Sequence, residues 1–341
     1  MKKSGKERVL VVCNSTGPTK IDQDFSKELR TEDWETENDV LKALRTLGHD
    51  CDLLGVFDST DVITEKIRRY CPNIIFNLVE RFKGEAAYDR DIASFFELLG
   101  VPFTGSGTTG LTLSKNKGIS KKILSYHKIR VPAFVILHHG KPVHRPSRLH
   151  FPIFIKPLSE EASLGISQAS FVENDDQFIE RVRFIHETMG QDAIAEEYID
   201  GRELYVSVLG NKQLRVFPIR EMKFSQVPED EPKFASYKAK WDKAYRKRWG
   251  IRNQFAGGLT EGTEEKIKKL CRKIYRLLCI RGYARFDLRL TSEDEIVFIE
   301  ANPNPILSEC EDFAVSARKG GVPYPQMIQK ILNLSVARNG Y

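Results

Sequence analysis

The order of hydrophobic and polar positions predicts alternating strands and helices in the first hundred residues. Short apolar runs indicate buried strands, and amphipathic stretches that stop at a glycine indicate helices. The predicted strands are 9–13, 51–56, 73–79 and 101–104, and the predicted helices are 35–47 and 89–99. Because strands and helices alternate at this spacing, we expect a parallel, Rossmann-like sheet.

The pattern changes after about residue 115, where several short strands follow one another. Strands are predicted at 134–137, 151–156, 166–172, 193–198, 203–209 and 214–220, and helices at 116–126, 175–187, 264–279 and 324–334. The stretch 283–290 is expected to form a hairpin with 295–301. Weak periodicity at 233–253 predicts a long ordered or lid-like loop. This part of the chain is therefore expected to be α+β with mixed, largely antiparallel strands.

Composition narrows the class of protein. The chain has 341 residues, 41% of them hydrophobic and 29% charged, which is typical of a soluble protein with two or three domains. Its apolar runs are far shorter than the roughly 20 residues of a membrane helix. The six cysteines include no CxxC pair, so neither a disulfide framework nor a zinc knuckle is indicated. We expect a cytoplasmic protein.

Charge is distributed unevenly along the chain. Residues 98–159 contain ten lysines or arginines and no acid, and residues 233–252 contain eight against the single acid Asp242. Two basic tracts indicate an anion held between them, most simply phosphate. Nucleic acid is the rival ligand, and a solvated charged face is the structural alternative. Nucleic acid is disfavoured because no recognised binding module or interleaved aromatic platform accompanies the charges.

A glycine-rich motif, Gly105-Ser-Gly-Thr-Thr-Gly110, follows the predicted strand 101–104. Dinucleotide binding would also require an acidic residue about 20 positions later, to hold a ribose hydroxyl. No acid occurs between this motif and Glu160. We interpret the motif as a turn that joins the first domain to the next.

The predicted hairpin carries the clearest chemistry. Arg285 and Asp287 share one face of a strand, and Glu300 and Asn302 share a face of its partner. Folding about 292–293 would bring 285–287 opposite roughly 298–301. Carboxylate and amide oxygens without histidine or cysteine suit Mg²⁺, which also binds substrate phosphates. The structural alternative is a salt bridge at a sheet edge.

Two lysines and an acidic segment add to this group. Lys156 lies in an otherwise apolar strand, so it must either reach solvent or meet an anion. Lys117 begins a helix within the acid-free tract, and the small-residue turn 159–165 offers backbone amides to a phosphate. In the segment 195–203, two acids stand at the end of a predicted strand, and a third acid stands where the next strand begins after a turn. Such a segment can bind adenine and ribose, or it can be a plain turn with solvated acids.

In this order the motifs resemble the ATP-grasp superfamily, specifically its D-alanine–D-alanine ligase-like branch. The resemblance covers nearly the whole chain. It is carried by 99–106, 116–124 with 129–132, 151–157, 196–203, 283–287 and 300–305. It implies a Rossmann-like N-terminal (pre-ATP-grasp) domain at 1–114. A two-lobed ATP-grasp fold would follow, with a small lobe at 115–199 and a C-terminal lobe at 200–341.

The resemblance also implies residue roles. The ATP-binding residues would be Lys117 and Lys156 at the phosphates, Ser163 and Gly165 in the loop that covers them, and Glu196, Glu203 and the backbone of Glu197 and Ile199 at the adenosine. Two Mg²⁺ ions, or Mn²⁺ in their place, would be bound by Asp287, Glu300 and Asn302. Arg285 would stabilise the acyl-phosphate and the tetrahedral intermediate, and Lys240 would meet the γ-phosphate from a lid loop.

The implied activity is ADP-forming ligation of a small carboxylate to an amine, without nucleic acid or membrane partners; a homodimer is an expectation of the family. The chain departs from the family where substrates bind. The segment 13–19 lacks the family's substrate-binding glutamate, and Glu309, Glu311 and Asp312 stand where the family uses a serine. We therefore expect substrates other than two D-alanines. The acids favour a cationic acceptor, or simply begin a helix. A non-catalytic ATP sensor is the alternative function, against which the complete set at 285–302 argues.

Overall fold

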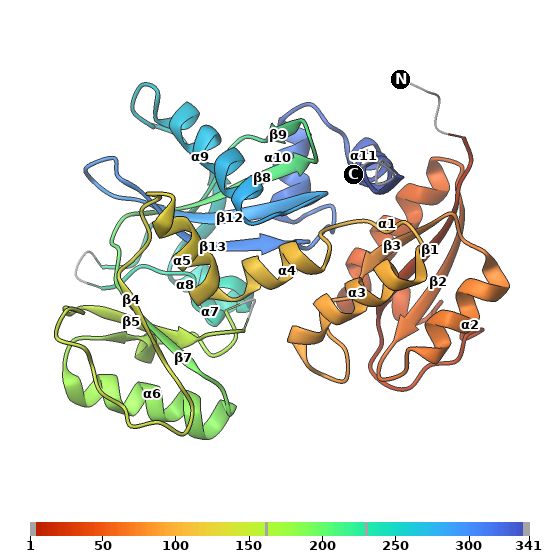
Figure 1. Cartoon of the computed structure of the whole chain (residues 1–341). Coiled ribbons are helices and arrows are strands. Elements are labelled where there is room, and N and C mark those ends of the chain that lie inside the picture. Colours follow the sequence, from red (N-terminus) through yellow and green to blue (C-terminus); the bar gives the residue numbers. More distant parts are fainter. Residues whose placement is uncertain (1–4, 161–162, 229–230, 337–341) are drawn as a thin grey trace.

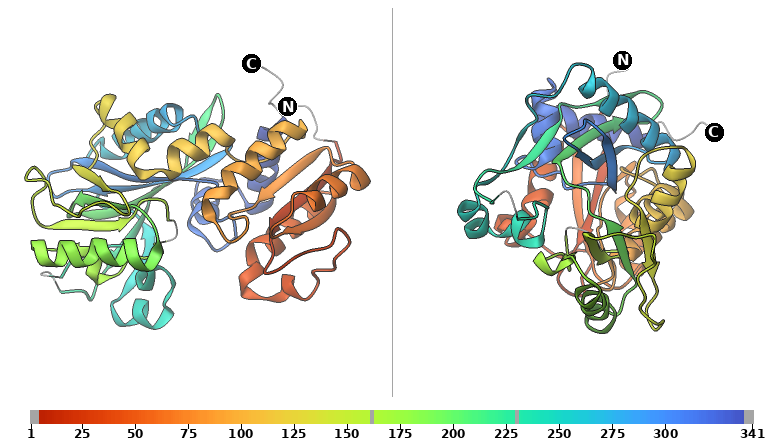
Figure 2. Two further views of the ribbon diagram at one scale, coloured as in Figure 1. Left: turned by 60° about the horizontal axis from the view of Figure 1, so that its bottom comes forward. Right: turned by 90° about the vertical axis from the view of Figure 1, so that its left-hand side faces the viewer.

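The computed structural model describes residues 5–160, 163–228 and 231–336. These residues form three sheets with helices packed around them (Figure 1). Figure 2 shows that the small lobe and the N-terminal domain lie at opposite ends of the molecule, with the largest sheet between them. Among the described helices, none is long and apolar enough to cross a membrane.

The N-terminal sheet is parallel, as expected, in the order β2-β1-β3. Its strands are β1 (Arg8–Asn14), β2 (Asp50–Val56) and β3 (Ile74–Leu78), and its helices are α1 (Glu35–Thr46), α2 (Asp61–Tyr70) and α3 (Asp89–Leu99). The predicted strand at 101–104 is reduced to a single bridge between Ile75 and Phe103. The Gly-rich segment after it leads directly into helix α4 (Thr108–Lys115).

The small lobe is an antiparallel sheet in the order β4-β7-β5-β6, covered by one helix. The elements are β4 (Phe134–Leu137), β5 (Ile153–Pro157), β6 (Phe171–Val172), β7 (Ala193–Glu197) and α6 (Asp175–Met189). The strand predicted at 166–172 is wrong for most of its length. Residues Gln168–Ser170 form a 3-10 turn instead, closed by reciprocal bonds between Ser167 and Ser170.

The central sheet has the order β11-β10-β8-β12-β13, with β9 paired to β8. Its strands are β8 (Arg202–Gly210), β9 (Leu214–Val216), β10 (Arg220–Phe224), β11 (Ile251–Phe255), β12 (Tyr283–Leu290) and β13 (Ile296–Pro303). Helices α5 (Lys117–Tyr126) and α9 (Thr263–Leu277) pack against it. Helices α10 (Asp312–Lys319) and α11 (Tyr324–Val336) follow the last strand.

One hydrophobic core joins the two ends of the chain. Helix α11 packs against α1, as Figure 1 shows, and Met327 and Ile331 share a buried cluster with Val9 and Val11. The N-terminal sheet is therefore held firmly against the C-terminal lobe. This packing sets the walls of the cleft described below.

The predicted lid loop at 233–253 is instead mostly regular. It contains two short helices, α7 (Tyr237–Trp241) and α8 (Lys243–Arg248), before β11. Ser236 accepts a hydrogen bond from the amide of Ala239, and Asp242 accepts one from the amide of Tyr245. These caps satisfy the free amides of very short helices, so local capping outweighs the weak hydrophobic periodicity.

Candidate active site

The hairpin β12–β13 brings together the four polar residues expected there, in a register shifted by two from the prediction. Asp287 lies opposite Glu300, and Arg285 lies opposite Asn302. The turn is longer than expected, because the amide of Thr291 bonds to the carbonyl of Glu295. A bulge between the paired positions 287/300 and 288/298 adds one residue more.

These residues continue a row across the central sheet. Asp287 pairs with Tyr205 of β8, and Tyr205 pairs with Arg220 of β10. The Arg285 guanidinium donates to both carboxylate oxygens of Asp287, at 2.8 and 3.0 Å, and lies 5.0 Å above the Tyr205 ring. The Arg285–Asp287 salt bridge considered from the sequence is thus present. It belongs to the row of polar side chains across the sheet, which forms the floor of the site, and is not an isolated pair at the sheet edge.

The charges on this floor affect one another strongly. Burial raises the pKa of Asp287 to about 6, with Arg285 opposing this shift and nearby Glu300 adding to it. Burial would also raise the pKa of Glu300, but Lys117, Lys156 and the other cations outweigh it and lower that pKa. Such close carboxylates favour a shared cation.

The donor set fits Mg²⁺. Asp287 and Glu300 supply carboxylate oxygens, Asn302 supplies an amide oxygen, and such hard oxygens are the ligands Mg²⁺ prefers. The amide nitrogen of Asn302 is buried and has no hydrogen-bond partner among the described residues. No cluster of three histidine, cysteine or acidic side chains suited to a metal occurs in the described part of the chain. A site here would therefore depend on water and substrate oxygens as further ligands.

Lys156 does not reach solvent; it meets an anion. Its side chain is 3% exposed, and its ammonium lies 3.1 Å from a carboxylate oxygen of Glu196. The other oxygen of Glu196 lies 3.0 Å from the ammonium of Lys121. Burial would raise the pKa of Glu196, but the two lysines outweigh it and lower that pKa.

Nine of the predicted residues line one small cavity between the lobes. They are Lys156, Ser163, Glu196, Glu197, Ile199, Glu203, Lys240, Asp287 and Glu300. Phe154 and Phe234, with ring centroids 4.9 Å apart, supply apolar walls. The cavity of about 70 Å³ is smaller than the roughly 300 Å³ of small ligand sites. Nucleotide binding would therefore have to widen it.

The residues near the covering loop are held by backbone contacts. Ser163 has a φ of 61° and donates to the carbonyl of Ala235, 2.7 Å away. Gly165 has a φ of 72°, and a Cβ there would meet Pro157 at 2.9 Å, so the position requires glycine. Lys117 donates to the carbonyl of Glu160 at the start of this loop. Glu161 and Ala162, within the turn expected to bind phosphate, lie outside the described residues.

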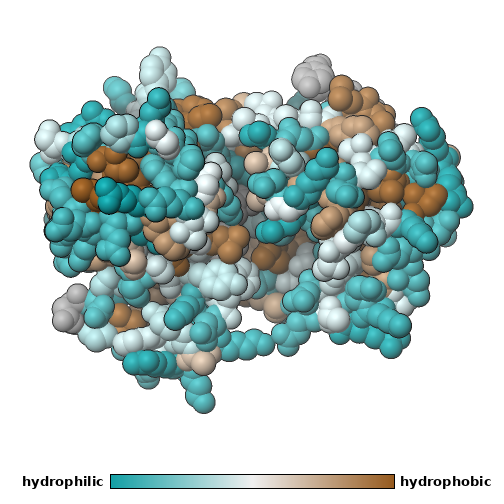
Figure 3. Space-filling view, turned by 90° about the horizontal axis from the view of Figure 1, so that it is seen from below, coloured by the Kyte–Doolittle hydropathy of each residue, from teal (hydrophilic) through white to brown (hydrophobic). Residues whose placement is uncertain are grey.

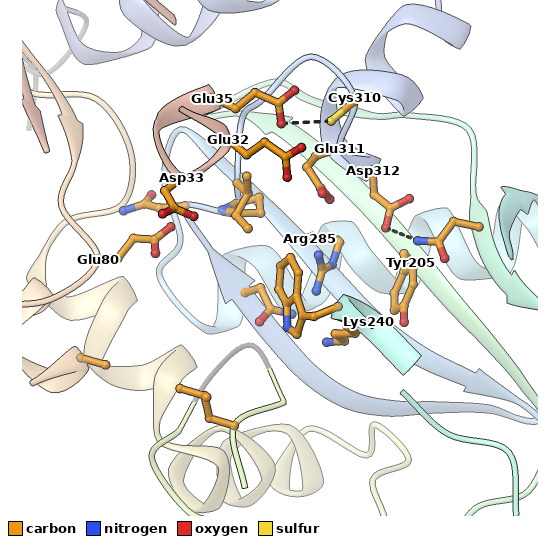
Figure 4. A pocket seen from close by; sticks show the side chains of 18 of the residues that line it. Glu32, Asp33, Glu35, Glu80, Tyr205, Lys240, Arg285, Cys310, Glu311 and Asp312 are labelled. Atoms are coloured by element: carbon orange, nitrogen blue, oxygen red, sulfur yellow. Dashed lines mark hydrogen bonds between the residues drawn. The ribbon is translucent and has the colours of Figure 1, made fainter. Parts of the chain in front are cut away.

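A much larger cavity, of about 1570 Å³, lies beside the first, and Lys240 lines both. It is lined by Arg285 and Asn302 from the central sheet and by residues of the N-terminal domain. Figure 3 shows a hollow between the two halves of the molecule from below. In Figure 4 acids face the cationic floor, with Glu32, Asp33, Glu35 and Glu80 from the N-terminal side.

A family model described as "D-ala D-ala ligase C-terminus" matches residues 115–333, well over half of the chain. The chain belongs to this D-Ala–D-Ala ligase family. A relative from Sinorhizobium fredii, described as the uncharacterized protein y4sG, is 30% identical over 97% of both chains. The D-alanine–D-alanine ligase of Syntrophobacter fumaroxidans is 27% identical, over 74% of this chain and 78% of its own.

The solved D-alanine–D-alanine ligase of Bacillus anthracis, complexed with ATP, superposes with a TM-score of 0.75. It is 20% identical and covers 97% of this chain, and 98% of that chain is matched. The expected Rossmann-like domain followed by an ATP-grasp fold is thereby confirmed, as is the resemblance to the D-Ala–D-Ala ligase branch. Membership of the family supports an ATP-dependent ligase.

Glu197 and Glu203, which were predicted to bind adenosine, form hydrogen bonds with other residues of the protein. The Glu197 carboxylate binds Arg130 through both oxygens and accepts from the amide of Ala133. Glu203 accepts from Arg289 at 2.9 Å and from the Tyr205 hydroxyl at 2.9 Å. These side chains can therefore shape the segment 196–203, whose backbone was expected to meet adenine.

The three acids after the last strand do not share one environment. Glu309 pairs with Arg318, and Asp312 pairs with Arg220 at 2.9 Å. Glu311 precedes the first residue of α10, and burial raises its pKa. Glu311 and Asp312 both line the larger cavity, and Glu309 is not among its lining residues.

Three residues of the candidate site were not predicted from the sequence: Lys121, Tyr205 and Arg220. Lys121 had a signal, because it lies one helical turn after Lys117 and one before the buried Leu124 on the same face. Tyr205 and Arg220 had no local signal. Their place beside Asp287 depends on the order of strands in the sheet.

Proposed function

We propose that this protein is an ATP-dependent carboxylate–amine ligase that forms an amide through an acyl-phosphate. The observation that carries the proposal is the group formed by Asp287 on β12 with Glu300 and Asn302 on β13, in which Glu300 lies opposite Asp287 and Asn302 lies opposite Arg285. Lys156 and Lys240 line the adjoining cavity. Fixed cations beside a hard-oxygen metal site are what phosphoryl transfer requires, because charge neutralisation and positioning supply most of its catalysis.

The reaction needs no protein nucleophile. A substrate carboxylate oxygen attacks the γ-phosphorus of ATP, and the bond to ADP breaks. The amine nitrogen then attacks the acyl carbon and loses a proton, and the carbon–oxygen bond to phosphate breaks. Bound Mg²⁺ would neutralise phosphate charge during transfer.

Roles follow from position. We assign Lys117, Lys156 and Lys240 to the phosphates, and Ser163 and Gly165 to the loop that covers them. Arg285 faces the larger cavity and would stabilise negative charge on the acyl group. The adenosine would lie along the segment 196–203, between the lobes.

The larger cavity supports substrates other than two D-alanines. Its acidic wall and its cationic floor would receive a molecule that carries both charges, with the carboxylate directed to Arg285. The absence of the family's substrate-binding glutamate from 13–19 agrees with a changed substrate.

The test is phosphate release from Mg–ATP with a pool of D- and L-amino acids, dipeptides and polyamines, with products identified by mass spectrometry. We expect a product with the mass of two pool members minus water. It should disappear in Glu300→Gln and persist in the control Glu293→Gln, which changes an exposed acid in the hairpin turn.

Two results would contradict the proposal. D-alanyl-D-alanine formed as the preferred product would refute the changed substrate. ATP binding without phosphate release for any pool member would favour the alternative, a non-catalytic nucleotide sensor.

A further inference from the structure

Lys121 is a lysine without access to solvent. Its exposed fraction is 0%, and it projects from α5 toward β13, where its ammonium lies 5.7 Å from the centre of the Phe298 ring. A charged ammonium is costly to bury unless every part of it is paired. Burial lowers the pKa of Lys121 to about 8, although Glu196 opposes this shift. Because burial of this ammonium lowers the stability of the folded protein, we look for a specific role for Lys121.

The ammonium of Lys121 connects two elements that carry predicted site residues. It lies 3.0 Å from one oxygen of Glu196 on β7, and it donates to the carbonyl of Ile299 on β13 at 2.5 Å. The second oxygen of Glu196 lies 3.1 Å from the ammonium of Lys156. Glu196 is thus shared between two lysines, of which only Lys156 lines the cavity with Glu300.

Ile299 is the extra residue of the bulge in β13. Glu300 pairs with Asp287 and Phe298 pairs with Leu288, which leaves Ile299 without a partner in the ladder. The Phe298 amide instead donates to the carbonyl of Arg130 at 2.9 Å. A bulge redirects the neighbouring side chain, and its unpaired carbonyl needs another donor. Lys121 is that donor, so it stabilises the backbone that directs Glu300.

Sharing Glu196 also affects Lys156. A carboxylate with two free oxygens can hold one ammonium with both of them. Lys121 occupies one oxygen, and Lys156 is therefore held through the other alone. If Lys121 were neutral, Glu196 would hold Lys156 more strongly, and fewer of its N–H groups would be free for a phosphate.

We propose that Lys121 is a positioning residue for this site: it keeps Lys156 available to the phosphates of ATP and holds the bulge that directs Glu300. The inference rests on the proposed function, since it assumes that Lys156 and Glu300 act on Mg–ATP. It goes beyond that function by assigning a role to a lysine that lines neither of the two cavities described above.

The experiment measures binding of Mg–ATP and of adenosine by isothermal titration calorimetry in wild type, Lys121→Met and Lys122→Met. Lys122 is the exposed neighbour on the same helix and is the matched control. We expect Lys121→Met to weaken Mg–ATP binding by about 10- to 100-fold, the usual effect of losing a group that orients a ligand-binding side chain. Adenosine binding should be weakened much less, because Lys156 still pairs with Glu196, and Lys122→Met should match wild type for both ligands.

The single variant Glu196→Gln and the double variant Lys121→Met/Glu196→Gln separate the two effects. Removing the carboxylate charge releases Lys156, so Lys121→Met should weaken Mg–ATP binding less in the Glu196→Gln background than in wild type. A role in stability alone would not produce this difference.

If Lys121→Met does not fold, Lys121→Arg replaces it, because it keeps the charge but its planar head cannot make the same pair of bonds. Equal loss of Mg–ATP and adenosine binding, or Mg–ATP binding at the wild-type level in the variant used, would overturn the positioning role. Failure of the wild-type protein itself to bind Mg–ATP would instead refute the proposed function.

Discussion

Glu37 destabilises the folded protein when it is ionised, and replacing it with glutamine should show how much. It lies in the first turn of α1 and is partly buried. Burial raises its pKa from 4.5 to about 7; a hydrogen bond from its own backbone amide opposes this shift, and the charge of Glu80 adds to it. Glutamine has the shape of the protonated acid and no charge to bury.

The sign follows from proton binding. Between pH 4.5 and about 7 the folded protein keeps a proton on Glu37 that the unfolded chain has released, so stability falls as pH rises through this range. The shift corresponds to about 3 kcal/mol at most. After a discount for solvent screening at a partly exposed group, we expect about 2 kcal/mol.

We therefore expect Glu37→Gln to raise the free energy of unfolding by about 2 kcal/mol at pH 8 and by almost nothing at pH 4. Urea denaturation followed by circular dichroism at four or five pH values measures this difference. Glu65→Gln, which replaces an exposed acid on α2, is the control and should show no such trend. A gain that is the same at every pH, or a loss at pH 8, would refute the electrostatic reasoning.

Three further predictions concern the central sheet. Arg220→Met leaves the buried carboxylate of Asp312 without its ion pair, and it should lower the free energy of unfolding by about 3 kcal/mol in urea titrations; adding Asp312→Asn should recover part of this loss, and no recovery would contradict the pairing. Phe286→Ala empties a fully buried position and should cost about 3–5 kcal/mol by the same measurement, so a cost below about 1 kcal/mol would be inconsistent with its packing. In thermal melts, Mg²⁺ should raise the Tm in the presence of a non-hydrolysable ATP analogue, and EDTA or Asn302→Ala should remove that increase; an equal increase in the variant would exclude Asn302 as a ligand.

The hairpin shows how far sequence reasoning reaches. The alternation at 283–290 and 295–301 predicted the two strands, and the spacing of two predicted that each pair of polar residues shares a face. The register was wrong by two, because the length of the turn and the bulge at Ile299 depend on backbone bonds that leave no mark in the hydrophobic pattern. In one of these bonds, the amide of Phe298 donates to the carbonyl of Arg130, which lies more than 160 positions earlier in the chain.

In the predicted lid loop, residues 233–253, the sequence contained a signal that the hydrophobic pattern did not show. Its helices α7 and α8 have too few residues for a hydrophobic period to be visible, but the capping residues Ser236 and Asp242 were readable signals. The strand expected at 166–172 failed because serine side chains closed a turn within it. In both segments local hydrogen bonds outweighed the apolar pattern.

The sequence by itself determined which chemistry the chain carries. Residue types and short spacings are local properties, so the acid-free tract, the lysines 117 and 156, and the polar pairs of the late hairpin could be recognised directly. Only the tertiary structure decided how these groups share charge. Glu196 lies between Lys121 and Lys156, and Asp287 pairs with Tyr205, because strands and helices distant in sequence pack together. That packing is driven by burial of apolar surface, which is not directional, and the polar partners are therefore fixed only when the whole core has formed.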